Sequence, residues 1–145
     1  MFLHKGLEIH EREDQGVVIL ELHGKLDMGD GAEALREFAG GLFEQGKRRI
    51  ALDLAKISDI DTSGSETLLI LAQQYRAAGG KLALFGIDRT HAKIYEMARL
   101  ESVIEIYASA LDAVNSFFPD RAVPHYDILD YVEQQPHEHK DAKTP

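Results

Sequence analysis

Apolar residues along the chain follow two kinds of spacing, one typical of strands and one typical of helices. The β-branched run Val17–Leu22 predicts a strand that stops at Gly24, and the apolar run 50–54 predicts a buried strand. Apolar residues three and four positions apart predict helices from Gly31 to about Gly46 and from about Ser63 onward. Strands and helices that alternate in this way indicate an α/β fold.

The whole pattern predicts one α/β domain with a mixed β-sheet, helices packed against it and the order ββαβαβαβα. A polar turn at 11–16 should join the first two strands as an antiparallel hairpin at or near an edge. Strand 50–54 should lie inside the sheet and connect to strand 81–86 through the second helix. The expected elements are strands 3–9 and 17–22, helix 31–46, strand 50–54, a helix from about 63, strand 81–86, helix 90–99, strand 103–106 and helix 108–118.

The composition changes after residue 118. Residues 1–118 make up the predicted domain, and 119–145 form a C-terminal extension that contains three of the seven histidines and no glycine. We expect this extension to be partly disordered, from about Gln134 onward, and residues 134–145 to be dispensable for folding.

Composition and charge exclude several classes of protein. The chain has 145 residues, no cysteine and a net charge of −9. The absence of cysteine excludes a disulfide framework and a thiol nucleophile, and the negative charge disfavours nucleic acids and anionic membranes as partners. No apolar run approaches membrane-spanning length, and the N-terminus lacks the apolar stretch of a signal peptide. We therefore expect a soluble, cytoplasmic domain without direct membrane insertion.

The segment 57–66, Ile-Ser-Asp-Ile-Asp-Thr-Ser-Gly-Ser-Glu, lies between a buried strand and a helix. Ser63 and Glu66 have the spacing of a capping box, in which each side chain bonds a free backbone amide. On this interpretation Thr62 precedes the cap with a free hydroxyl, and Gly64 leaves the first turn open to another protein. The segment is then either only a well-capped helix start or also a charge switch, because a helix N-terminus tolerates phosphate.

Four short stretches, taken in order, resemble the STAS domain, best known from bacterial anti-sigma factor antagonists. The resemblance covers about residues 3–118, and the element order agrees with it. It implies a regulatory protein-interaction domain and no enzyme. At Ser65-Glu66 the chain departs from the family, whose members usually carry a Leu-Gly-like pair there. The stretches are Gly24–Asp27, Leu52–Leu54, Ile60–Gly64 and Ala77–Leu82.

The resemblance also implies a phosphorylation site and partners. The hydroxyl residue directly after the aspartate, Thr62 here with Ser63 as the alternate, would be phosphorylated by an anti-sigma factor with serine/threonine kinase activity. A phosphatase would reverse the modification. Asp27 and Asp61 each follow a strand and could approach each other near Thr62, or each could merely end its element. The implied partner-binding residues are Asp27, Asp61, Thr62, Ser63, Gly64 and Glu66.

Two alternative functions stay open. Within the family, a cytoplasmic STAS subunit of an ABC phospholipid transporter would suit Asp61–Gly64 equally well. Outside it, the chain could be a small nucleotide-binding protein or enzyme, since Gly29–Ala34 fits a G-x-G-x-x-A fingerprint. That fingerprint requires its first glycine immediately after the strand, and Lys25–Met28 intervene. No catalytic pair emerges from the sequence, so we expect neither catalysis nor a cofactor.

The histidines predict no metal site. His137 and His139 alternate in the extension without a third close ligand, which is usually incidental. The remaining histidines of the domain are expected as isolated strand or surface residues; they are His4, His10, His23 and His91.

Overall fold

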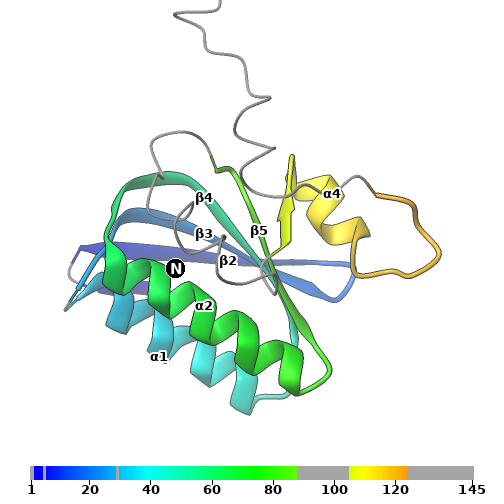
Figure 1. Cartoon of the computed structure of the whole chain (residues 1–145), viewed down its shortest axis with the longest axis horizontal. Helices are drawn as coiled ribbons and strands as arrows, with labels where there is room; N and C mark the ends of the chain where they lie inside the picture. The colour runs from blue at the N-terminus through cyan, green and yellow to red at the C-terminus, as the bar shows by residue number, and fades with distance from the viewer. Residues whose placement is uncertain (1, 5, 29, 88–104, 124–145) are drawn as a thin grey trace, which may run out of the picture.

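The computed structural model describes residues 2–4, 6–28, 30–87 and 105–123. The strands are β1 (Phe2–His4), β2 (Leu7–Asp14), β3 (Val17–Leu26), β4 (Arg49–Ile60), β5 (Lys81–Phe85) and β6 (Glu105–Tyr107). The helices are α1 (Gly31–Glu44), α2 (Thr62–Ala77) and α4 (Ala110–Asn115). They build a six-stranded sheet in the order β1-β2-β3-β4-β5-β6. Helices α1 and α2 lie side by side on one face, and α4 packs beside β5 and β6 (Figure 1).

The sheet is mixed, as the sequence predicts. The pairs β1–β2 and β2–β3 are antiparallel, whereas β3, β4, β5 and β6 are parallel to one another. Strand β4 lies between β3 and β5, so the predicted interior position of 50–54 is confirmed, and α2 makes the connection to β5. The predicted fold class is confirmed, but the predicted strand 3–9 is divided: Phe2–His4 form β1, Gly6 lies in a turn with φ of 83°, and Leu7 begins β2.

The N-terminal hairpin is longer than predicted. Residues 11–14, predicted as part of a turn, continue β2, and Asp14 pairs with Val17. Only Gln15 and Gly16 form the turn, with φ angles of 55° and 83°. Two successive left-handed residues give the tight turn that matches strand twist. The prediction of a five-residue polar turn was wrong because exposed charged side chains are compatible with a strand whose backbone is paired on one side.

The prediction that the second strand stops at Gly24 was also wrong. Strand β3 runs on to Leu26, and Gly24 lies inside it with φ of 117°. A side-chain carbon at Gly24 would overlap the carbonyl oxygen of Gly6, and the pairing of β3 with β4 shifts register beside it. Gly24 therefore marks an irregularity at a close backbone approach, which glycine permits.

Alternate residues of the central strands face two apolar layers. Leu20, Leu52 and Leu84 belong to the larger core beneath α1 and α2. Their strand neighbours face the smaller core, which α4 covers with Ala113 and Val114. This alternation is why β5 and the first parts of β3 and β4, Val17–Leu20 and Ile50–Leu52, have almost continuous apolar sequences, as strands buried on both faces require. Members of the smaller core include Val17, Ile19, Ala51, Ala83, Phe85 and Tyr107.

The C-terminal elements agree with the sequence in type and shift in position. Strand β6 overlaps the predicted strand 103–106, and α4 occupies the middle of the predicted helix 108–118. The Ser109 hydroxyl caps α4 by accepting a hydrogen bond from the Asp112 amide at 3.1 Å. The predicted helix 90–99 and the extension beyond residue 123 lie outside the described residues, so the dispensability of 134–145 stays a prediction.

Candidate functional site at the carboxyl end of the parallel strands

Helix α2 begins where β4 ends, and Asp61 is its N-cap. The backbone of Asp61 is extended, and its Oδ1 accepts a hydrogen bond from the Gly64 amide at 2.9 Å. The prediction that Ser63 is the cap was wrong. Aspartate caps helices as well as serine does, and the helix starts at Thr62, so Ser63 and Glu66 fall two positions too late for a capping box.

The second carboxylate oxygen of Asp61 ties this helix to another segment. Its Oδ2 accepts a hydrogen bond from the Met28 amide at 3.0 Å, and the Asp61 amide donates to the Leu26 carbonyl at 3.3 Å. Burial alone would raise the pKa of Asp61, but the backbone donors, chiefly Gly64 and Met28, outweigh it and hold the pKa below its ordinary value. Asp61 is therefore an ionised clamp between the start of α2 and the segment after β3.

Two glycines let both helices begin against the end of β3. A side-chain carbon at Gly64 would overlap the carbonyl oxygen of Leu26, and one at Gly31 would overlap that of Lys25. Gly64 is buried, so it allows close packing of the helix against β3. The sequence instead suggested that Gly64 leaves the first turn open to another protein. Gly31 has the same role in α1, which gives the G-x-G-x-x-A pattern a structural explanation.

The hydroxyl residues of the segment differ in exposure. Thr62 is exposed at the first position of α2, Ser63 is half-buried and Glu66 is exposed. Ser65, which the resemblance placed with Glu66 as a departure on the docking face, is instead 4% exposed. Its Oγ has no hydrogen-bond partner in the described part of the chain. Thr62 is therefore the most accessible of the three hydroxyls.

The surface around Thr62 is acidic. Asp59 and Glu66 are exposed on either side of the helix start, and Asp30 is exposed before α1. Asp27 is half-buried, and its carbonyl accepts a hydrogen bond from the Ala32 amide at 2.9 Å. The structure thus brings the Asp27 segment and Asp61 to one end of the sheet through backbone contacts of Leu26 and Met28.

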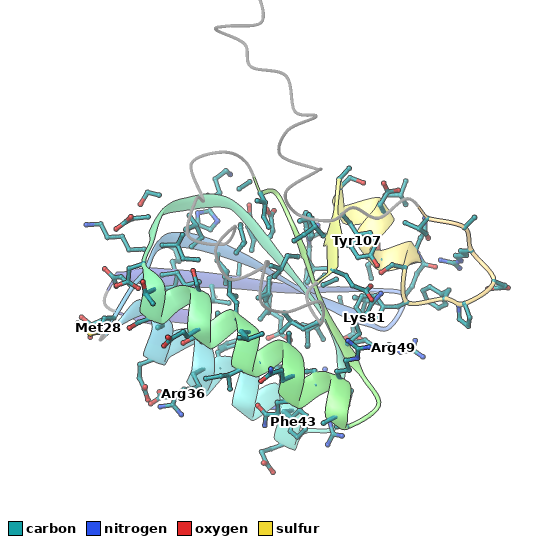
Figure 2. All side chains as sticks on the ribbon, viewed as in Figure 1. Met28, Arg36, Phe43, Arg49, Lys81 and Tyr107 are labelled. Atoms are coloured by element: carbon teal, nitrogen blue, oxygen red, sulfur yellow. The ribbon has the colours of Figure 1, made fainter. Side chains whose placement is uncertain are left out.

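One residue of this end has no counterpart in the sequence prediction. Met28 is 74% exposed, and Figure 2 shows it at the end of the molecule opposite Arg49 and Lys81. An apolar side chain in a polar turn was the available signal, but only the hydrogen bond to Asp61 relates it to the site.

The histidines are less isolated than predicted. The rings of His10 on β2 and His23 on β3 lie 4.6 Å apart, with Glu8 and Glu21 beside them. Among the described residues no group of histidine and acidic side chains is arranged to hold a metal ion. Likewise, no helix in the described ranges is long and apolar enough to span a membrane.

The combination of this sheet, these helices and this helix start defines a family. The STAS domain family model matches residues 8–113, most of the chain. The chain therefore belongs to the STAS domain family, and its fold is that of anti-sigma factor antagonists.

Three relatives illustrate the match. The provisionally assigned anti-sigma factor antagonist BtrV of Bordetella bronchiseptica is 26% identical over 102 residues, covering 70% of this chain and 87% of BtrV. An anti-sigma factor antagonist of Mycobacterium paratuberculosis has a TM-score of 0.67 at 15% identity, covering 77% of this chain and 93% of that one. The Bacillus cell-fate determinant SpoIIAA in its phosphorylated form has a TM-score of 0.58 at 21% identity, covering 76% and 97%.

Proposed function

We propose that this chain is a cytoplasmic anti-sigma factor antagonist whose partner binding is switched by phosphorylation of Thr62. The observation that carries the proposal is the exposed Thr62 at the start of α2, directly after the capping aspartate. Membership of the STAS family supports it, as does the solved phosphorylated form of SpoIIAA. In this proposal the chain is not an enzyme. An anti-sigma factor with kinase activity is its partner, and a serine/threonine phosphatase resets it.

The chemistry of the modification places all catalysis in the partner. The Thr62 hydroxyl oxygen takes the γ-phosphoryl group of ATP, ADP leaves, and the hydroxyl proton passes to a base of the kinase. An exposed first-turn hydroxyl with no partner in the described part of the chain can enter another protein's active site. The half-buried Ser63 is less able to do so, which supports Thr62 as the acceptor.

The electrostatic consequence of phosphorylation follows from the neighbours of Thr62. A phosphate adds about −1.5 to −2 charges. Asp59, Asp61 and Glu66 already make this end negative, so an interface that closes over the phosphate would bury repelling charges. A penalty of about 3 kcal/mol would weaken binding roughly a hundredfold.

The test uses purified anti-sigma factors with kinase folds from the same genome, each incubated with the chain and Mg-ATP. We expect one of them to phosphorylate Thr62, as mapped by mass spectrometry. Thr62→Ala should bind that kinase as the wild type does and accept no phosphate, whereas Thr62→Asp should bind more weakly. Ser63→Ala is the matched control and should still be phosphorylated.

Two results would contradict the proposal in different ways. Phosphate on Ser63 instead of Thr62 would reverse the assignment of the two hydroxyls. Full-strength binding by Thr62→Asp, with no phosphate on either residue, would indicate a constitutive scaffold, which is what the transporter-subunit alternative expects. Nucleotide binding by the purified chain alone would favour the enzyme or nucleotide-binding alternative.

A further inference from the structure

Met28 is the most exposed large apolar side chain among the described residues. It is 74% exposed, compared with 64% for Leu111 on α4 and 55% for Ile70 on α2. Scattered exposed apolar residues are ordinary, so exposure alone assigns no role to Met28. The position of Met28 suggests a role, because its backbone amide is hydrogen-bonded to Asp61, the residue that caps the helix of Thr62.

The backbone that carries Met28 is held on several sides. The Met28 amide bonds Asp61 Oδ2 at 3.0 Å, and the preceding Leu26 carbonyl accepts from the Asp61 amide at 3.3 Å. Gly64 of α2 packs closely against the same carbonyl. Because this backbone is already ordered, binding would order only the Met28 side chain, which lowers the entropic cost of using Met28 as an interface anchor.

The surroundings of Met28 define the chemistry of a partner. Asp30, Asp59 and Glu66 are exposed at this end, and Lys25, the register partner of Asp59, is exposed as well. Met28 therefore projects among mostly acidic side chains. The complementary surface is an apolar pocket bordered by lysine or arginine side chains. A flexible thioether fits such a pocket well.

We propose that Met28 is the apolar anchor with which this chain docks on the kinase that modifies Thr62, and that Asp61 is the residue that positions it. This inference rests on the proposed function and deepens it. The occupant is therefore a protein with a basic-rimmed apolar pocket beside its active site. Phosphate on Thr62 would then place its charge next to the carboxylate that holds the anchor.

The first test compares the binding of single variants to the purified kinase identified above, with ADP in place of ATP so that no phosphate is transferred. Met28→Ala should weaken binding at least tenfold. Leu111→Ala, which truncates another exposed apolar side chain on α4, should change it less than twofold. Equal melting temperatures should show that both variants keep the fold.

The second test separates positioning from a merely structural role of Asp61. An asparagine at 61 can still cap Gly64 through its carbonyl oxygen, but with that oxygen engaged its amide group cannot accept from Met28. Asp61→Asn should weaken binding in the wild type and have little further effect in Met28→Ala. Hydrogen exchange at the Met28 amide should accelerate in Asp61→Asn.

The outcomes distinguish the two proposals. If the wild type binds no kinase, the proposed function fails and the anchor fails with it. If the wild type binds, Thr62→Asp weakens binding and Met28→Ala does not, only the anchor is wrong. If Asp61→Asn and Met28→Ala act additively, Met28 is an anchor that Asp61 does not position, and that part of the inference is overturned.

Discussion

The two ends of the parallel sheet are built in different ways. At the amino end, polar side chains bind one another. Lys81 donates hydrogen bonds to Glu105 at 3.1 Å and to the Ser116 hydroxyl at 2.8 Å, and its ammonium lies 4.5 Å from the centre of the Phe117 ring. Arg48 bonds the Phe43 carbonyl at 3.2 Å and lies over its ring.

At the carboxyl end, backbone contacts take the place of these side-chain contacts. Gly31 and Gly64 bring both helices against the end of β3, and Asp61 bonds only backbone amides. Thr62, Glu66 and Met28 are left exposed. The amino end also has a close backbone approach, since a side-chain carbon at Gly80 would overlap the Arg48 carbonyl oxygen, but it adds the side-chain contacts of Lys81 and Arg48. The comparison teaches that the carboxyl end around Thr62 relies on backbone contacts and on Asp61, and leaves its other side chains available for a partner.

Gly64→Ala should have the largest effect, because the new carbon would overlap a backbone carbonyl that cannot move without shifting β3. We expect a loss of about 3 kcal/mol in the free energy of unfolding, measured by urea denaturation. Gly41→Ala, in the last turn of α1 with open space around it, is the control and should gain about 0.5 kcal/mol. Equal stabilities would show that the carboxyl end is not held by close backbone packing.

Lys81→Met should remove the side-chain hydrogen bonds at the amino end of the sheet and leave the contacts at the carboxyl end intact. The Lys81 side chain is 22% exposed and its ammonium makes several hydrogen bonds, so its loss should lower the free energy of unfolding by about 2 kcal/mol. Lys47→Met removes only a 3.6 Å surface pair with Glu13 and should cost about 0.5 kcal/mol or less. Reduced phosphorylation of Thr62 in Lys81→Met would contradict the separation of the two ends.

Asp61→Ala should cost about 1 kcal/mol at neutral pH, through the lost cap. The folded pKa of Asp61 lies below the ordinary aspartate value of 3.8, so its contribution is present above about pH 4 and disappears as the pH falls through the folded pKa. Urea titrations of both proteins should therefore converge in acid. Ser63→Ala is the control and should change stability by less than about 0.5 kcal/mol, because Ser63 is not the cap.

Ser65→Ala should have the smallest effect and the opposite sign. Removing a buried hydroxyl without a partner in the described part of the chain, and adding a better helix former, should raise the free energy of unfolding by about 0.5 kcal/mol. Ser109→Ala removes a hydroxyl that caps α4 and should instead lower stability by about 1 kcal/mol. A loss in Ser65→Ala comparable to that in Ser109→Ala would show that the Ser65 hydroxyl has a partner.

Most elements of this fold can be predicted from the sequence because their apolar residues keep the regular spacing of a strand or a helix. The prediction ended the central strand at residue 54, whereas β4 continues to Ile60. In this last part the buried residues Ile57 and Ile60 are three positions apart, not two, and the register with β3 shifts nearby. A pattern search based on strict alternation cannot follow a strand through such an irregularity.

The candidate site was predicted in its position and not in its internal contacts. Asp61, Thr62 and Ser63 were identified from a helix start and a family resemblance. Which of the polar residues caps α2 depends on where β4 ends and on contacts with Leu26 and Met28, more than thirty positions earlier in the chain. Local propensity favours Asp61 and Ser63 equally, so tertiary contacts decide.

The lengths of the flanking strands have a consequence for association between copies of the chain. In the described ranges, β1 and β6 span three residues each, while β3 and β4 span ten and twelve and lie inside the sheet. A foreign strand could align with only a short row of unpaired backbone groups on β1 or β6. The part of β2 beyond β1 is also unpaired on that side, but its residues Glu11–Asp14 are all charged and oppose such pairing. Short or charged edges of this kind disfavour the extension of the sheet into fibrils, and the long apolar strands β3 and β4 remain inside the sheet.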